Sequence, residues 1–133
     1  MTVAFENSEL KPVPEELMVA IKSHHAYLSG RPGGLRLNNN ELDVSHCRFD
    51  YMSLAQAMLP CAEFSESSCV RSDFSEADLY GSNFAWAKLE GAIFAKADIR
   101  GANFVMADLT GASMQNADLR PGQIVRWSRN ASG

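Results

Sequence analysis

Residues 97–111 read ADIRG-ANFVM-ADLTG, three consecutive five-residue units of one pattern. Each unit begins with alanine, continues with aspartate or asparagine, and places a large apolar residue third. An apolar residue keeps this third position at every fifth residue from Val44 to Ile124, and none of these seventeen residues is charged. A fixed repeat of this length has to be explained before any local assignment of helix or strand.

A period of five fits neither kind of regular secondary structure. An α-helix repeats every 3.6 residues and a strand every 2.0, so neither keeps such a series on one face. A bend after each five-residue side removes the conflict, because every side can then turn its large and its small residue into a common interior. Turns stacked at about 4.8 Å, the spacing of paired strands, would bury the apolar side chains that a single turn leaves exposed. The pattern therefore predicts an all-β solenoid.

The best-formed units also carry a resemblance to a known family. ADLYG at 77–81, ADIRG at 97–101, ADLTG at 107–111 and ADL at 117–119 resemble the pentapeptide-repeat proteins, whose unit is A-(D/N)-(L/F)-X-X. The resemblance covers roughly residues 42–124. It implies a right-handed quadrilateral β-helix with four units per coil, and so about four coils in this chain.

The residues before the repeat predict an N-terminal α-helical cap. Pro14 suits the first turn of a helix, and Leu17, Ile21 and His24 lie on one stripe of it. A solenoid needs its open first coil covered, so we expect this helix to pack there; a partner-binding helix is the alternative. The expected organisation is a flexible N-terminus at 1–13, the capping helix and connecting loop at 14–41, the β-helix at 42–127 and a disordered tail at 128–133.

Composition limits the classes of partner and compartment. The net charge is −4, and residues 41–124 hold twelve acidic and six basic residues, which argues against direct binding of nucleic acid. The chain has no long apolar run for a membrane span and no basic-then-apolar leader for secretion. Three cysteines at irregular spacing match neither a disulfide framework nor a zinc motif. These features predict a cytoplasmic protein.

No grouping of residues at a meaningful spacing predicts catalysis. His24 and His25 are adjacent and would point about 100° apart on a helix, so they cannot chelate one metal as a pair. His46 and the cysteines form no recognisable nucleophile or metal motif. We therefore expect no enzyme activity, cofactor or metal. The competing hypothesis of a metal or catalytic site would require stoichiometric metal in the purified protein.

Two outward surfaces follow from the register, because residues twenty apart would stack vertically. One is an acidic column of aspartates, Asp78, Asp98 and Asp118, backed two residues later by Tyr80, Arg100 and Arg120. Arg100, Arg120 and Lys88 would dilute its negative charge. The other is an apolar candidate interface comprising Trp86, Val105, Met106, Val125 and Trp127. Tryptophan and methionine are enriched in interface cores, which favours a contact surface over scattered surface apolars.

The functional hypothesis from these features is a non-enzymatic interaction scaffold that binds a protein partner through its outer columns. A homodimer through the C-terminal coil is a further expectation, with a fragment of a longer protein as the alternative. The resemblance implies a second function: some pentapeptide-repeat proteins mimic duplex DNA, bind gyrase and protect it from quinolones or toxins. That reading requires a dense negative surface.

Overall fold

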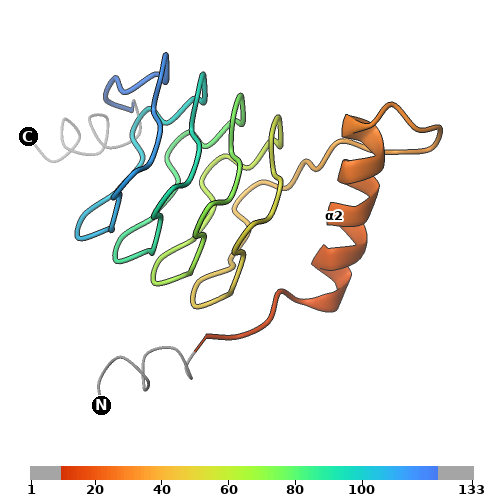
Figure 1. Ribbon diagram of the computed structural model, residues 1–133, viewed down its shortest axis with the longest axis horizontal. Coiled ribbons are helices and arrows are strands. Elements are labelled where there is room, and N and C mark those ends of the chain that lie inside the picture. The colour runs from red at the N-terminus through yellow and green to blue at the C-terminus, as the bar shows by residue number, and fades with distance from the viewer. Residues whose placement is uncertain (1–9, 123–133) are drawn as a thin grey trace, which may run out of the picture.

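The computed structural model describes residues 10–122 of the chain. Within this range the chain forms a row of stacked coils with one α-helix at the N-terminal end of the row (Figure 1). No helix in this range is long and apolar enough to cross a membrane. The expected disordered tail at 128–133 lies outside the described residues.

Parallel β-bridges join residues that are twenty positions apart, and this separation is the length of one turn. Along one side of the stack the bridged residues are Asn38, Met58, Asp78, Asp98 and Asp118. These bridges span four turns, and neighbouring sides are offset by five residues. The prediction of a solenoid is confirmed, and the paired register begins slightly before the expected residue 42.

Each five-residue side contributes one bridged residue to the ladder. Asp78 N–H donates to the Ala57 carbonyl of the preceding turn at 2.9 Å. Leu79 N–H donates to the Asp98 carbonyl of the following turn at 2.8 Å. A bend then closes the side, where Ser82 N–H donates to the Leu79 carbonyl at 3.0 Å. Isolated bridges therefore take the place of extended strands over residues 10–122.

The large inward residues form columns of stacked side chains. The ring centroids of Phe64 and Phe84 lie 4.8 Å apart, and Phe104 continues this column at 5.3 Å from Phe84. Phe74 and Phe94 stack in the neighbouring column at 5.1 Å. These separations are close to the spacing of paired strands, so the backbone register itself brings the rings into stacking distance.

The helix α2 spans Glu15–Leu28 and lies beside the first coil (Figure 1). Two acidic residues in its first turn interact favourably with the positive end of the helix dipole. Leu17, Ile21 and His24 are its buried residues, and the first two belong to the same apolar core as the inward residues of the coils. A short helix is marginal alone in water, so this packing stabilises it.

The segment before α2 pairs with the first coil. Lys11 forms a parallel bridge with Cys47, with Lys11 N–H donating to the His46 carbonyl at 2.7 Å. Arg48 N–H donates back to the Lys11 carbonyl at 2.9 Å. The flexible N-terminus expected at 1–13 therefore needs correction at its end, because Lys11 acts as an added edge of the first coil. Residues 1–9 lie outside the described range.

Candidate functional site

The aspartates of the predicted acidic column have a structural role at the corners of the coil. The Oδ1 atom of each accepts the backbone N–H two residues later, at 3.1 to 3.2 Å, in the pairs Asp78–Tyr80, Asp98–Arg100 and Asp118–Arg120. Asn83 accepts the Ala85 N–H in the same way at 2.9 Å. This local bond explains why the unit prefers aspartate or asparagine at its second position.

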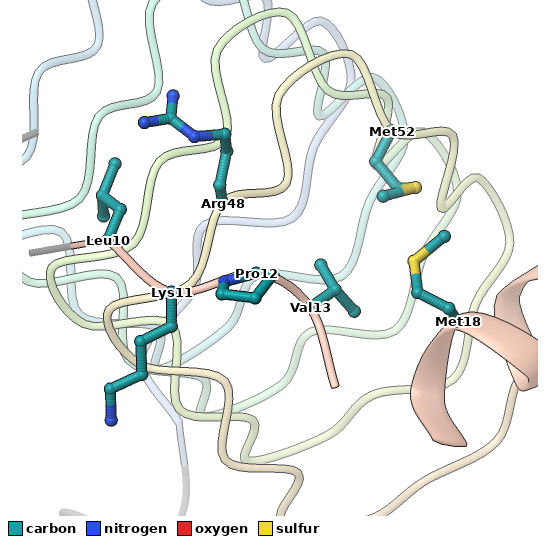
Figure 2. A pocket seen from close by; sticks show the side chains of 7 residues that line it. All are labelled: Leu10, Lys11, Pro12, Val13, Met18, Arg48 and Met52. Carbon is teal, nitrogen blue, oxygen red and sulfur yellow. The ribbon is translucent and has the colours of Figure 1, made fainter. Parts of the chain in front are cut away.

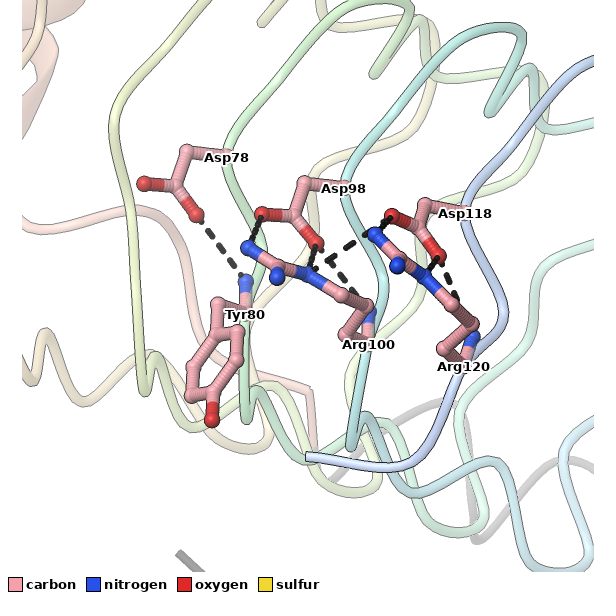
Figure 3. A network of polar contacts seen from close by, with 6 residues as sticks. All are labelled: Asp78, Tyr80, Asp98, Arg100, Asp118 and Arg120. Carbon is pink, nitrogen blue, oxygen red and sulfur yellow. Dashed lines mark hydrogen bonds and ion pairs between the residues drawn. The ribbon is translucent and has the colours of Figure 1, made fainter. Parts of the chain in front are cut away.

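The same aspartates are joined to arginines in what we term the Asp98 network: Asp78, Tyr80, Asp98, Arg100, Asp118 and Arg120 (Figure 3). The Arg100 guanidinium forms two hydrogen bonds of 2.8 Å with Asp98 and lies 3.7 Å from Asp118. Arg120 binds Asp118 in the same two-pronged geometry at 2.9 and 2.7 Å. The Arg100 guanidinium also lies 5.1 Å from the centre of the Tyr80 ring. The column is therefore cross-linked along the stack.

The arginines largely neutralise the charge of this column. Hydrogen bonding from Arg120 lowers the pKa of Asp118 to about 2, and the bond from Arg100 lowers the pKa of Asp98. Three carboxylates and two guanidinium groups leave a formal charge of −1 on the network. The surface is thus a string of ion pairs, and a dense negative stripe is absent from it.

The Trp86 patch, defined here as Trp86, Val105 and Met106, is an exposed apolar surface. These side chains are 58%, 61% and 64% exposed. Trp86 and Met106 occupy left-handed corner positions with φ of 63° and 60°, a conformation that bulky residues rarely adopt. Glycine occupies four equivalent corners, Gly81, Gly91, Gly101 and Gly111. Val125 and Trp127, the other predicted members of this interface, lie outside the described residues.

The Trp86 patch ends in a polar pair nearer α2. Two turns and one turn earlier, the same corner carries His46 and Glu66, whose side chains approach to 2.9 Å. The corner thus changes from a polar pair to tryptophan and methionine between the second and third turns. The apolar character is local, and it is separate from the Asp98 network on another side of the coil.

Sequence reasoning missed an apolar groove beside the first coil (Figure 2). Its volume is about 480 Å³, and it is lined by Leu10, Lys11, Pro12, Val13, Met18, Arg48 and Met52. Arg48 forms an ion pair with Asp50 at 3.0 Å, so its charge is already engaged. The groove depends on Lys11 pairing with Cys47, residues far apart in sequence, and no local pattern marks it.

The buried cysteines and the histidines of α2 have surroundings that favour structural roles. Burial raises the pKa of the Cys69 thiol to about 12 and also raises that of Cys47, so both are protonated and poor nucleophiles. Over residues 10–122, histidine, cysteine and carboxylate side chains form no cluster of three suited to a metal ion. His24 and His25 instead contact backbone carbonyls of the first coil.

The chain is similar in sequence and fold to known proteins. Its ranges 59–94, 67–104 and 94–120 match a family model described as pentapeptide repeats, in eight copies. A pentapeptide repeat protein from the Arabidopsis thaliana thylakoid lumen superposes with a TM-score of 0.62 at 27% identity, over 66% of this chain and 61% of that chain. The match thus spans about three fifths of that relative. No curated protein matches the sequence.

Two further structures are more distant. A pentapeptide repeat protein from the cyanobacterium Cyanothece 51142 has a TM-score of 0.48 at 24% identity, over 63% of this chain and 61% of that chain. QnrB1, a plasmid-mediated fluoroquinolone resistance protein, has a TM-score of 0.26 at 16% identity, over 68% of this chain and 66% of that chain. Superpositions this loose carry no functional argument.

Proposed function

Because the repeat region of this chain belongs to the pentapeptide-repeat family, we propose that the protein is a non-enzymatic scaffold that binds a protein partner through the Trp86 patch. The scaffold is a right-handed quadrilateral β-helix of about four coils with α2 as its N-terminal cap. Its three free cysteines, Cys47, Cys61 and Cys69, favour the reducing cytoplasm as its compartment.

The observation that carries this proposal is that three exposed apolar side chains gather on adjacent turns: Trp86 N–H donates to the Val105 carbonyl at 2.9 Å, and Met106 lies one turn after Trp86. A bulky side chain in the left-handed region is strained by about 1–2 kcal/mol relative to the right-handed region. An outward residue that is 58% exposed recovers little of this through burial in the fold. The left-handed conformation is shared by the other corners, Tyr51 included, so the strain does not single out Trp86. The gathering of Trp86, Val105 and Met106 does, because tryptophan is enriched among the residues that dominate binding energy.

The test is affinity capture with the wild type, the double variant Trp86→Asp, Met106→Asp, and the control Tyr51→Asp. Tyr51 is 72% exposed and also occupies a left-handed corner, with φ of 62°. The proposal predicts one protein that wild type and Tyr51→Asp capture and the double variant loses. Equal capture by all three proteins would refute the role of the patch.

A second copy of the chain is proposed as a further partner, at the C-terminal coil. Leu119 occupies the same place in the repeat as Ile99, yet it is 64% exposed while Ile99 is 2% exposed. Stacking two such ends would bury both sets of apolar residues. Sedimentation should then show a dimer that Leu119→Glu converts to monomer; a wild-type monomer at all concentrations would eliminate this pairing.

The alternative function, a DNA-mimicking binder of gyrase that gives quinolone or toxin protection, has weaker support. Duplex DNA carries about one charge per 1.7 Å. The acidic column offers one carboxylate per turn of about 4.8 Å, and Arg100 and Arg120 offset two of its three charges. A supercoiling assay tests this function directly. Inhibition or quinolone protection at micromolar protein would favour mimicry over the scaffold proposed above.

A further inference from the structure

In the interior coils, N–H groups of the preceding turn donate hydrogen bonds to the backbone carbonyls. The equivalent carbonyls at one edge of the first coil need other donors. In the second turn, the Asp73 carbonyl accepts Leu54 N–H at 2.7 Å. The Ser75 carbonyl accepts Gln56 N–H at 2.8 Å. The residues twenty positions before these acceptors are Ser53 and Ala55, at the edge that faces α2. An exposed row of such carbonyls is an open sheet edge.

Two adjacent histidines of α2 satisfy these edge carbonyls. His24 Nε2 lies 2.7 Å from the Ala55 carbonyl oxygen, and His25 Nε2 lies 2.9 Å from the Ser53 carbonyl oxygen. A carbonyl oxygen only accepts, so both Nε2 atoms carry the proton and donate it. The imidazoles therefore take the place that backbone N–H groups of a preceding turn occupy elsewhere in the stack.

His24 is held as a neutral imidazole by a second bond. Its Nδ1 lies 2.9 Å from the backbone nitrogen of Leu37, and a backbone N–H can only donate. Nδ1 must therefore be unprotonated in this arrangement. His24 is also completely buried, where an imidazolium would be poorly solvated. A proton added at Nδ1 would face the Leu37 N–H and remove that bond.

On balance, the surroundings of His24 oppose a positive charge and lower its pKa. Burial lowers this pKa most, the hydrogen bond to the Ala55 carbonyl raises it, and the nearby charges of His25 on the same helix and Arg36 on the connecting loop lower it. The Tyr27 ring stacks on the imidazole at 5.9 Å. The first coil presents the Ala55 carbonyl, and no carboxylate lies within ion-pair distance of His24 among residues 10–122.

We propose that α2 is an acid-released cap, which separates from the first coil when His24 takes a second proton. At pH values above the ordinary imidazole pKa of about 6.5, His24 is neutral whether α2 is docked or released, so docking of α2 is fully stable. Below pH 6.5, His24 binds a second proton in the released form, and docking weakens until the pH reaches the lowered pKa of His24 in the docked form. His25 differs, because its single bond through Nε2 is compatible with either charge state.

Hydrogen exchange tests this inference at pH 7.5 and pH 5.5, after correction for intrinsic rates. One proton changes the docked-to-released ratio by at most about tenfold per pH unit below 6.5. Protection of residues 15–28 should fall by up to about that factor, while residues 58–100 remain protected. His25→Gln should keep this response. His24→Gln, which keeps an amide donor but cannot titrate, should lose it.

Nuclear magnetic resonance of the wild type gives a test that needs no variant. The inference requires His24 to show the Nε2–H tautomer and to titrate below 6.5. A His24 pKa at or above 6.5, or unchanged protection of residues 15–28 between the two pH values, would overturn it. Equal loss of protection in residues 58–100 would also overturn it, since global unfolding is a different event from release of α2.

Discussion

Replacement of Phe84 by alanine should test whether the aromatic columns stabilise the solenoid. Phe84 is completely buried and stacks between Phe64 and Phe104, at 4.8 and 5.3 Å. It also meets Phe74 and Phe94 edge to face, at 5.7 and 5.6 Å. The substitution removes one ring from four aromatic contacts and leaves a cavity at the centre of the stack.

The expected loss is large compared with the stability of a small domain. Buried phenylalanine to alanine costs about 3–5 kcal/mol, and domains of this size are stable by about 5–15 kcal/mol. Phe104→Ala is the matched control, because Phe104 is half-buried and has aromatic contacts with Phe84 and Phe94 alone among the residues described. Because Phe104 has half as many aromatic contacts as Phe84, Phe104→Ala should lower the free energy of unfolding by roughly half as much as Phe84→Ala.

Urea unfolding followed by circular dichroism measures both losses, and linear extrapolation converts them to free energies. Phe84→Leu, which retains much of the apolar volume, should fall between the wild type and Phe84→Ala. Equal losses for Phe84→Ala and Phe104→Ala would contradict the view that a turn gains its stability from neighbours on both sides. So would a loss below about 1 kcal/mol for Phe84→Ala.

Three further outcomes follow from the corners of the coil. Gly101→Ala should lower the melting temperature more than Gly111→Ala, although both glycines have positive φ. A Cβ at Gly101 would lie 2.8 Å from Gly122 Cα, a clash, whereas a Cβ at Gly111 would lie 3.9 Å from Gly91 N, an ordinary contact; equal shifts would contradict this. Asp98→Ala should lower the free energy of unfolding in urea by about 1 kcal/mol. Asp98→Asn should lower it less, because asparagine keeps the Oδ1 acceptor for the backbone N–H of Arg100. Folding lowers the pKa of Asp118 from 3.8 to about 2, so its contribution to folding stability is complete above pH 3.8 and is lost as the pH falls through about 2. A midpoint near 3.8 for this carboxyl group by nuclear magnetic resonance would refute its ion pair with Arg120.

Much of the interior could be assigned from the period of five. Phe64, Leu79 and Phe84 are buried as the repeat predicts, because a bend after each side returns the third residue of every unit to the interior. Trp86 and Met106 are exposed for the same reason, as corner residues. Periodicity specifies direction well, since it depends only on the position of a residue within its unit.

The environment of an outward residue could not be assigned in this way. Arg100 was expected to dilute the charge of the acidic column, but its partners were not assigned: it binds Asp98 and also lies 3.7 Å from Asp118 on the next turn. His24 and His25 gave no metal or catalytic motif, and their partners are carbonyl groups about thirty residues away. These contacts depend on which rotamer a side chain adopts toward a neighbouring turn, and the sequence of a single repeat unit does not predict that rotamer.

The amino-acid sequence by itself determined the repeat, the solenoid and the side of the wall on which each residue of the repeat lies. It could do so because a strict period restricts the backbone to one way of burying its apolar series. The tertiary structure alone decided how Lys11 joins the first coil, how α2 covers it through His24, and which carboxylates of the Asp98 network each arginine binds. Those features depend on contacts between residues far apart in the sequence, which come together only when the coils stack.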